Sequence, residues 1–180
     1  MDRLIKKIAR GNRKAQSQFY DEFCSLVMGV CLRYTRDRDL AEDVFQEAFI
    51  KIFQNIGSLK DTGAVHGWVK RITINTALDH LNALRFVESI ENESYELSDQ
   101  FYAQLLDKLT NEVVLEAINK LPEGYRIVFN MSVIDGYSHK EIAKDLNISE
   151  STSRSQLVHS KRLLKKYLNE LGITRYEQVI

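Results

Sequence analysis

Proline and glycine are scarce in this chain of 180 residues, which has one proline and eight glycines. A β-sandwich or β-barrel needs many tight turns, and tight turns depend on these two residue types. Apolar side chains recur instead at helical spacing, first from Phe19 to Tyr34 and again from Val44 to Ile52. We therefore predict an all-α protein in which long helices are joined by short loops.

The first half of the sequence predicts one small helical domain, residues 1–85. Its expected helices are a short one around Leu4–Ile8, a second that closes near Asp37, a third over Leu40–Asn55 and a fourth over Val65–Leu84. Gly57 is expected to stop the third helix, since glycine is common just past a helix end. Four apolar residues should pack the fourth helix into the domain: Trp68, Ile72, Leu78 and Leu81.

An acidic stretch, residues 86–110, follows this domain and predicts a linker. It has no sustained apolar period, and Lys108 is its only cation. Its carboxylates are Glu88, Glu91, Glu93, Glu96, Asp99 and Asp107. At roughly 3.3 Å for each residue, such a linker could span about 85 Å, which is more than two turns of duplex DNA.

The remaining residues, 111–180, predict a second helical domain that ends in a helix-turn-helix. One helix should end at Pro122, and another should run from about Tyr125 to Ile134 before Gly136 stops it. Two further helices are expected over Ser138–Leu146 and Glu150–Leu168. The predicted fold class is therefore all-α, with two small helical domains joined by an acidic linker.

The helix-turn-helix prediction depends on four local signals at the correct offsets. Ser138 and Glu141 form a capping box that starts the first helix, and Asn147 tolerates the left-handed backbone of a tight turn. Ser149 then caps the second helix, and Ala143 is small where the two helices must cross. The alternative is an ordinary helical hairpin with a solvated basic face. We favour DNA binding because the capping box, the small crossing residue, a turn plugged by Ile148 and a basic second helix occur together at the correct offsets.

The formal net charge is zero, but the charges are unevenly distributed. The first fourteen residues carry six cations against Asp2, and residues 150–167 carry five against Glu150. Basic ends around an acidic middle can conceal a nucleic-acid footprint behind a neutral total.

Several classes of function and location are disfavoured by the sequence. It contains no apolar run of about 18 residues and no signal-peptide core, so we expect a soluble, cytoplasmic protein without direct membrane insertion. Cys24 and Cys31 should be reduced core residues, and the four histidines lack zinc spacing. With no catalytic triad, metal cluster or phosphate-binding glycine loop in the sequence, we expect no enzyme, no metal and no cofactor.

Three segments resemble the extracytoplasmic-function (ECF) family of RNA polymerase sigma factors. They are DLAEDVFQEAFIKIF (39–53), HGWVKRITINTALDHLNALR (66–85) and LPEGYRIVF (121–129), the last followed by the helix-turn-helix. The resemblance covers nearly the whole chain in the family's order. It implies a sigma factor that binds RNA polymerase core, recognises minus-35 and minus-10 promoter elements and promotes DNA melting. A stand-alone helix-turn-helix regulator is the alternative, and a helical adaptor that does not bind DNA is a third hypothesis.

The resemblance also implies roles for particular residues. An acidic face would bind the polymerase through Asp39, Glu42, Asp43, Gln46 and Glu47. The minus-10 element would be held by Lys70, Arg71, Asn75 and Arg85, with the Gly57–Gly63 loop forming part of a pocket for a splayed base. The minus-35 element would be contacted by Thr152, Arg154, Ser155, His159, Lys161 and Arg162. An anti-sigma protein, often membrane-bound, is the implied further partner.

Two departures from the family pattern affect the second helix of the helix-turn-helix. Ser153 stands where many members of the family carry a β-branched apolar residue, which predicts looser packing of this helix. His159 and Lys161 stand where arginine is common, so the DNA contacts there are expected to differ.

Overall fold

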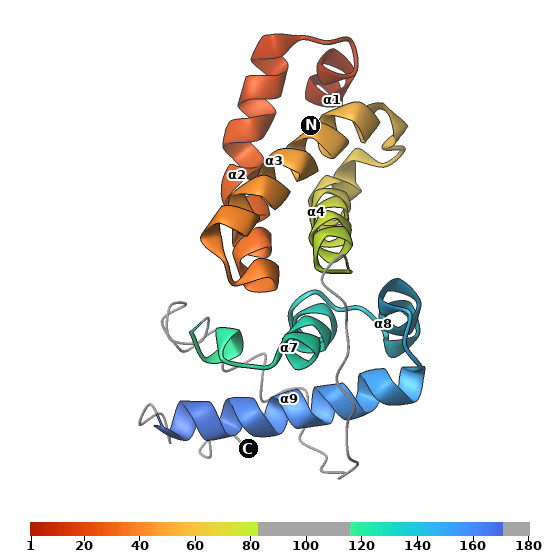
Figure 1. The fold of residues 1–180 in the computed structure, drawn as a ribbon. Helices are drawn as coiled ribbons and strands as arrows, with labels where there is room; N and C mark the ends of the chain where they lie inside the picture. The colour runs from red at the N-terminus through yellow and green to blue at the C-terminus, as the bar shows by residue number, and fades with distance from the viewer. Residues whose placement is uncertain (83–115, 171–180) are drawn as a thin grey trace, which may run out of the picture. The chain divides into compact units, whose positions relative to one another are not determined.

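The structure is a computed structural model that describes residues 1–82 and 116–170. Every regular element in these two ranges is helical, and the chain divides into two compact units, Met1–Arg85 and Phe86–Ile180 (Figure 1). The predicted all-α fold with two helical domains is confirmed. The linker predicted at residues 86–110 lies outside the described residues.

In the first unit, three long helices pack on one another around a shared core, and a short N-terminal helix packs on their side (Figure 1). The helices are α1 (Asp2–Ile8), α2 (Arg13–Thr35), α3 (Arg38–Asn55) and α4 (Val65–Asn82). Two 3-10 turns, η1 (Ile56–Ser58) and η2 (Thr62–Ala64), connect α3 to α4. α3 therefore ends at Asn55, and Gly57 lies within the 3-10 turn that follows it.

Polar side chains cap the starts of α2 and α3. Asn12 caps α2, because its Oδ1 accepts from the backbone N–H of Ala15 at 3.0 Å. Asp37 caps α3 in the same way, accepting from the N–H of Leu40 at 2.8 Å. Each such cap contributes about 1 kcal/mol. Asp37 thus begins α3, whereas the sequence placed the end of the preceding helix there.

The core of this unit is centred on aromatic side chains of α2. Phe19, Phe23 and Tyr34 are fully buried, and the rings of Phe19 and Phe23 stack with centroids 4.3 Å apart. Ile52 of α3 and Ile74 of α4 complete the core from the facing helices. Each large apolar side chain buried in this way stabilises the fold by about 1.5–3 kcal/mol.

The two cysteines of α2 differ in exposure. Cys31 is fully buried, and burial raises the pKa of its thiol to about 12, partly opposed by a backbone hydrogen bond. Cys24 is only partly buried, and both thiols are free. The prediction of two core cysteines is therefore confirmed for Cys31 and wrong for Cys24, because Cys24 lies at the edge of the buried side of α2, next to the fully buried Phe23.

In the described part of the second unit, three complete helices pack together. They are α7 (Glu123–Phe129), α8 (His139–Leu146) and α9 (Glu150–Glu170), with a π-helical turn (Asn130–Ile134) after α7. Both α7 and α8 pack on α9. Pro122 is the N-cap of α7, so Glu123 and Gly124 already belong to the helix, where the sequence predicted a turn.

Glycine has a specific role at two points of the second unit. A Cβ atom at Gly124 would lie 3.4 Å from the side-chain amide of Gln156, so glycine allows α7 and α9 to approach closely. Gly136 adopts φ +74°, a left-handed conformation that few other residues reach without strain, and it ends the helical segment as predicted. Ile118, Leu121 and Leu164 fill the core beneath these contacts.

Within residues 1–82 and 116–170, no helix has both the length and the apolar character needed to cross a membrane. In the same ranges, no three His, Cys, Asp or Glu side chains gather as a metal site would require. The absence of a metal or cofactor requirement stays a prediction.

Candidate polymerase and nucleic-acid interfaces

The acidic residues of α3 form the outward side of that helix. Their spacing places them on one face, opposite the buried residues Val44, Ala48 and Ile52. Three of them, Asp39, Glu42 and Asp43, are exposed, and the neutral Gln46 is exposed on the same face. Glu42 accepts an ion-paired hydrogen bond from Arg38 at 3.2 Å, a surface pair that contributes little to stability. The carboxylates of this face are therefore accessible to a partner in the folded protein.

Glu47, the fifth residue of the predicted acidic face, belongs to an ion network between α3 and α4. Its two carboxylate oxygens lie 2.8 Å from Lys51 Nζ and 2.6 Å from His80 Nε2. Lys51 also pairs with Asp79 at 3.1 Å. Hydrogen bonds from Lys51 and then from His80 lower the pKa of Glu47. The sequence did not single out Lys51 or His80, although the spacing of Glu47 and Lys51 is that of a helical ion pair.

These charges also affect the ammonium group at the centre of the network. Burial is the largest single effect on Lys51 and pulls its pKa down. The hydrogen bonds to Glu47 and Asp79 together outweigh burial, so the pKa of Lys51 is raised overall. Lys51 is therefore held in its charged form between two carboxylates.

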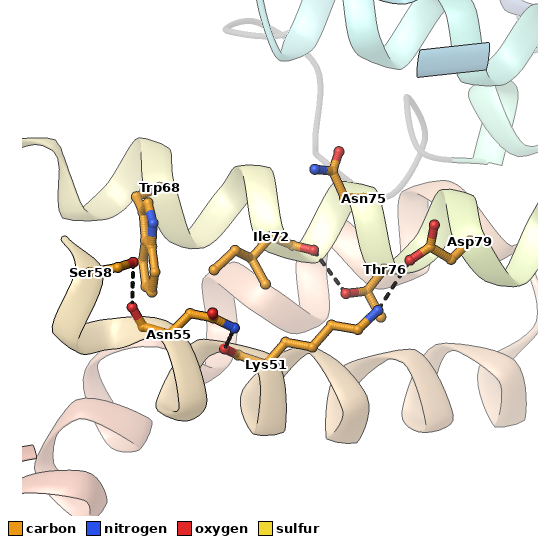
Figure 2. A pocket seen from close by; sticks show the side chains of 8 residues that line it. All are labelled: Lys51, Asn55, Ser58, Trp68, Ile72, Asn75, Thr76 and Asp79. Carbon is orange, nitrogen blue, oxygen red and sulfur yellow. Dashed lines mark hydrogen bonds and ion pairs between the residues drawn. The ribbon is translucent and has the colours of Figure 1, made fainter. Parts of the chain in front are cut away.

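A hollow of about 370 Å³ lies between α3 and α4, next to this network (Figure 2). It is lined by Lys51, Asn55, Ser58, Trp68, Ile72, Asn75, Thr76 and Asp79. Figure 2 shows the indole of Trp68 at one end of the hollow and the Lys51–Asp79 pair at the other. The hollow thus combines a flat apolar surface with charged and amide groups.

Internal hydrogen bonds fix part of the hollow's lining. The Asn55 amide donates to the carbonyl of Lys51 at 2.8 Å, and Ser58 donates to the carbonyl of Asn55 at 2.7 Å. The hydroxyl of Thr76 donates to the carbonyl of Ile72 at 2.9 Å. Asn75 is exposed, and Figure 2 shows its amide projecting away from the other labelled side chains. The Asn75 amide therefore lies at the rim of the hollow and points to solvent, not into the hollow.

The predicted minus-10 residues do not all lie together. Arg71 is exposed one helical turn before Asn75, so these two share a side of α4. Lys70 is half-buried and lies about a third of a turn around α4 from that side. Arg85 lies outside the described residues. The prediction that Trp68 and Ile72 pack in the core is wrong, because both are partly exposed and line the hollow.

The helix-turn-helix has the local geometry that its sequence predicts. Ser138 and Glu141 form a reciprocal capping box at the start of α8. Asn147 adopts φ +53° and ψ +44°, the left-handed conformation expected of the turn. The hydroxyl of Ser149 accepts from the backbone N–H of Thr152 at 2.9 Å and thereby caps α9. Three of the four local signals, namely the capping box, the turn and the second cap, therefore correspond to the observed geometry.

Ser153, the departure from the family pattern, is fully buried and has a polar partner. Its hydroxyl lies 2.8 Å from Nδ1 of His139, the first residue of α8. This hydrogen bond joins the two helices at their crossing. The expected loosening is therefore offset by a polar contact that the sequence did not predict.

The six predicted minus-35 residues divide into two groups by exposure: four are at least partly exposed and two are buried. Arg154 and Arg162 are exposed, while Thr152 and Ser155 are half-buried; Arg154 pairs with Glu150 at 2.9 Å. His159 and Lys161 are 7% and 5% exposed, because they lie on the side of α9 that faces the unit's interior. The His159 ring stacks on Tyr125 with centroids 5.6 Å apart. Fewer of the predicted residues of α9 are therefore accessible to DNA than the sequence indicated.

Comparisons with known proteins match both units in the same order. The sigma-70 region 2 family matches residues 19–86, and the sigma-70 region 4 family matches residues 111–164. The RNA polymerase sigma-H factor of Pseudomonas aeruginosa is 27% identical to the chain, and the alignment covers 93% of each. The ECF RNA polymerase sigma-E factor of Escherichia coli is 28% identical, covering 93% of this chain and 94% of that protein.

Two solved structures share the fold. CnrH in complex with the cytosolic domain of CnrY aligns with a TM-score of 0.50 and 20% identity, covering 93% of this chain and 96% of that one. The sigma factor RpoE in complex with the anti-sigma factor NepR, from Bartonella quintana, aligns with a TM-score of 0.54 and 16% identity. That second alignment covers 85% of this chain and 96% of RpoE.

Proposed function

Since this chain belongs to the extracytoplasmic-function family of RNA polymerase sigma factors, we propose that its two helical units divide promoter recognition between them. The family directs RNA polymerase to promoters. We assign polymerase binding and the minus-10 element to residues 1–85, and the minus-35 element to residues 111–180. Residues 86–110 would connect the two as an acidic linker.

The hollow between α3 and α4 is the observation that best supports minus-10 recognition by the first unit. It lies in the unit that matches sigma-70 region 2, and its volume of about 370 Å³ is within the range of small-ligand sites. A base can enter such a hollow only after it leaves the duplex stack. Trp68 offers a flat surface for that base, and Asn75 offers both a donor and an acceptor. We therefore assign the hollow to one unstacked base of the promoter.

Strand opening would follow from this binding preference. A site that binds only the unpaired base shifts the equilibrium of the promoter toward the melted state. Stacking on an aromatic side chain contributes about 1–3 kcal/mol for each base. The chain itself would need no nucleotide hydrolysis, and we propose that it is an initiation factor and not an enzyme.

The outward side of α3 would bind the polymerase. Asp39, Glu42, Asp43 and Gln46 are exposed along it, and negative charge near a helix start is favoured by the helix dipole. We propose that these residues dock on the clamp helices of the largest subunit. To bind the polymerase, Glu47 would have to give up its ion pairs with Lys51 and His80. We therefore expect Asp43 to contribute more to polymerase binding than Glu47.

The outward side of α9 would contact the minus-35 element. Arg154 suits bidentate recognition of guanine, Thr152 and Ser155 suit short contacts, and Arg162 suits phosphate. We do not propose His159 and Lys161 as contacts, because more than nine-tenths of each residue is buried. Their positions instead support the packing of α9.

The location and a further partner are also proposed. The polymerase works in the cytoplasm of bacteria, so we place the chain there with it. An anti-sigma protein is the expected regulator, since RpoE of Bartonella quintana was solved with the anti-sigma factor NepR. Such a partner would act by covering polymerase-binding surfaces.

Transcription with purified core polymerase tests the proposed function. We expect core plus this chain to initiate at a subset of genomic fragments, with unpaired thymines at the start site detected by permanganate. Asn75→Ala should reduce melting about tenfold with unchanged core affinity, as expected for loss of about 1–1.5 kcal/mol of hydrogen bonding. Gln54→Ala is the matched control, because it removes an exposed amide of α3 that does not line the hollow. Failure of the unmodified chain to support any initiation would contradict the proposal.

A further inference from the structure

The N-terminal end of the first unit carries a dense group of exposed cations. Six residues of α1, the following turn and the start of α2 form this group, which we call the α1 basic surface: Arg3, Lys6, Lys7, Arg10, Arg13 and Lys14. Within residues 1–82 and 116–170, none of them pairs with a carboxylate. Asp2, the acidic residue of α1, is hydrogen-bonded to Thr62. The surface therefore has no internal counter-charge among the described residues.

The packing of α1 directs these cations away from the protein. Ile5 and Ile8 are 5% and 3% exposed and attach α1 to the rest of the unit. Arg3 and Lys7 lie one turn apart on the opposite side. Like charges at this spacing destabilise a helix by a few tenths of a kcal/mol. An arrangement that repels itself in the free protein is relieved when an anion binds.

The loop beside the hollow holds α1 in place. Thr62 of η2 bonds to Asp2 at the start of α1. At the other end of α1, a Cβ atom on Gly57 would be 3.7 Å from the Cβ of Ala9. Gly57 is followed by Ser58, which lines the hollow. The two ends of α1 are thus fixed to the segment that forms one wall of the hollow.

We infer that the α1 basic surface binds phosphates of the same promoter strand whose base occupies the hollow. The inference depends on the proposed function of the hollow and extends it by a second contact surface. Exposed lysine and arginine side chains neutralise phosphates irrespective of base sequence. The helix is about 10 Å long, so it can follow two or three consecutive nucleotides. The contact would hold the unpaired strand and would add affinity without base selectivity.

The salt dependence of binding tests this inference. The assay uses the full chain with core polymerase on a promoter duplex that contains a preformed bubble. The slope of log K against log salt is negative, and each single-strand phosphate contact contributes about 0.7 to its magnitude. Loss of three such contacts should therefore make the slope about 2 less steep. We therefore expect the variant Lys6→Gln/Lys7→Gln/Arg10→Gln to show that smaller slope and at least a tenfold weaker affinity at about 0.1 M salt.

Two control variants separate this effect from general charge and from misfolding. Lys6→Arg/Lys7→Arg keeps the charge and should keep the slope of the unmodified chain. Arg36→Gln removes an exposed cation at the other end of α2, about 34 Å away, and should also leave the slope unchanged. Thermal unfolding followed by circular dichroism should be the same for all these variants, since each altered side chain is exposed.

The outcomes distinguish this inference from the proposed function. If the triple variant binds core normally but keeps the full slope, the inference is overturned and the function of the hollow stands. If the unmodified chain with core does not bind the bubble at all, the proposed function itself fails. Loss of binding to phosphatidylserine vesicles with unchanged DNA affinity would assign the surface to lipid instead. Neutral methylphosphonate linkages beside the unpaired base should reproduce the loss seen in the triple variant.

Discussion

The two units present their candidate sites in different ways. In the first unit, the hollow forms between α3 and α4 from residues such as Lys51 and Asp79, which are far apart in sequence and joined by an ion pair. In the second, the candidate site is the outward side of a single helix, α9. A site between helices depends on tertiary packing, whereas a site on one helix depends on how that helix starts and turns. The first should therefore be sensitive to mutations that alter packing, and the second to mutations of single contacts.

The largest expected effect is on polymerase binding by the first unit. Asp43→Lys reverses an exposed charge on α3 and should weaken core binding at least a hundredfold, because placing like charges together at an interface costs several kcal/mol. Fluorescence anisotropy with labelled chain and purified core measures the affinity. Glu116→Lys, an exposed reversal in the second unit, is the control and should leave core affinity unchanged. Equal behaviour of the two variants would remove α3 from the interface.

The next effect belongs to the second unit and should leave polymerase binding intact. Arg154→Ala should cost about 1–3 kcal/mol of discrimination between the preferred promoter and one with a changed minus-35 base. Arg162→Ala should weaken all sequences alike, as expected of a phosphate contact. Competition binding by the holoenzyme measures both variants. If Arg154→Ala weakens every sequence equally, Arg154 holds phosphate and does not read a base.

A smaller effect concerns the crossing of α8 and α9. Ser153→Val should destabilise the protein by about 1 kcal/mol, because the hydrogen bond between His139 Nδ1 and the Ser153 hydroxyl is lost. His139→Ala/Ser153→Val should recover part of this loss, since the ring nitrogen that made this bond is then absent. Chemical denaturation gives the free energies of unfolding. A more stable Ser153→Val single variant would show that the apolar residue typical of the family packs better even beside His139.

The smallest effect tests the ion network of the first unit through its pH dependence. Because the pKa of Glu47 is lower in the folded protein, its contribution to stability is complete above its ordinary pKa of about 4.5 and is lost as the pH falls through the folded value. Glu47→Gln should therefore be less stable than the unmodified chain at pH 7, by less than about 1 kcal/mol because the group is largely exposed. The difference should disappear in acid. Thermal unfolding between pH 7 and pH 3 measures it, and a constant difference would contradict the network's role.

The same contrast explains how much of the molecule the sequence could predict. Caps and turns are local, so Ser138, Asn147 and Ser149 were identified correctly from their spacing alone. The all-α fold follows from apolar periodicity in the same way. These signals need no knowledge of which helices touch.

The hollow depends on contacts that the sequence does not show. Trp68 and Ile72 have the apolar spacing of core residues, yet they line the hollow because neither α3 nor η1 covers them fully. Glu47 has the spacing of the acidic face, but it binds His80, which lies 33 residues further along the chain. His159 and Lys161 are polar residues on an inward side, where polarity suggests exposure. In each case, tertiary packing determined the outcome and local pattern did not.

The central claim is that this chain recognises promoters together with RNA polymerase and opens them by holding unpaired DNA. Promoter affinity measured with the chain alone and with added core polymerase tests it most directly. We predict weak binding by the chain alone and at least hundredfold tighter binding with core, with a further gain when the minus-10 region is already unpaired. Tight binding of intact duplex by the chain alone, with no association with core, would contradict the account.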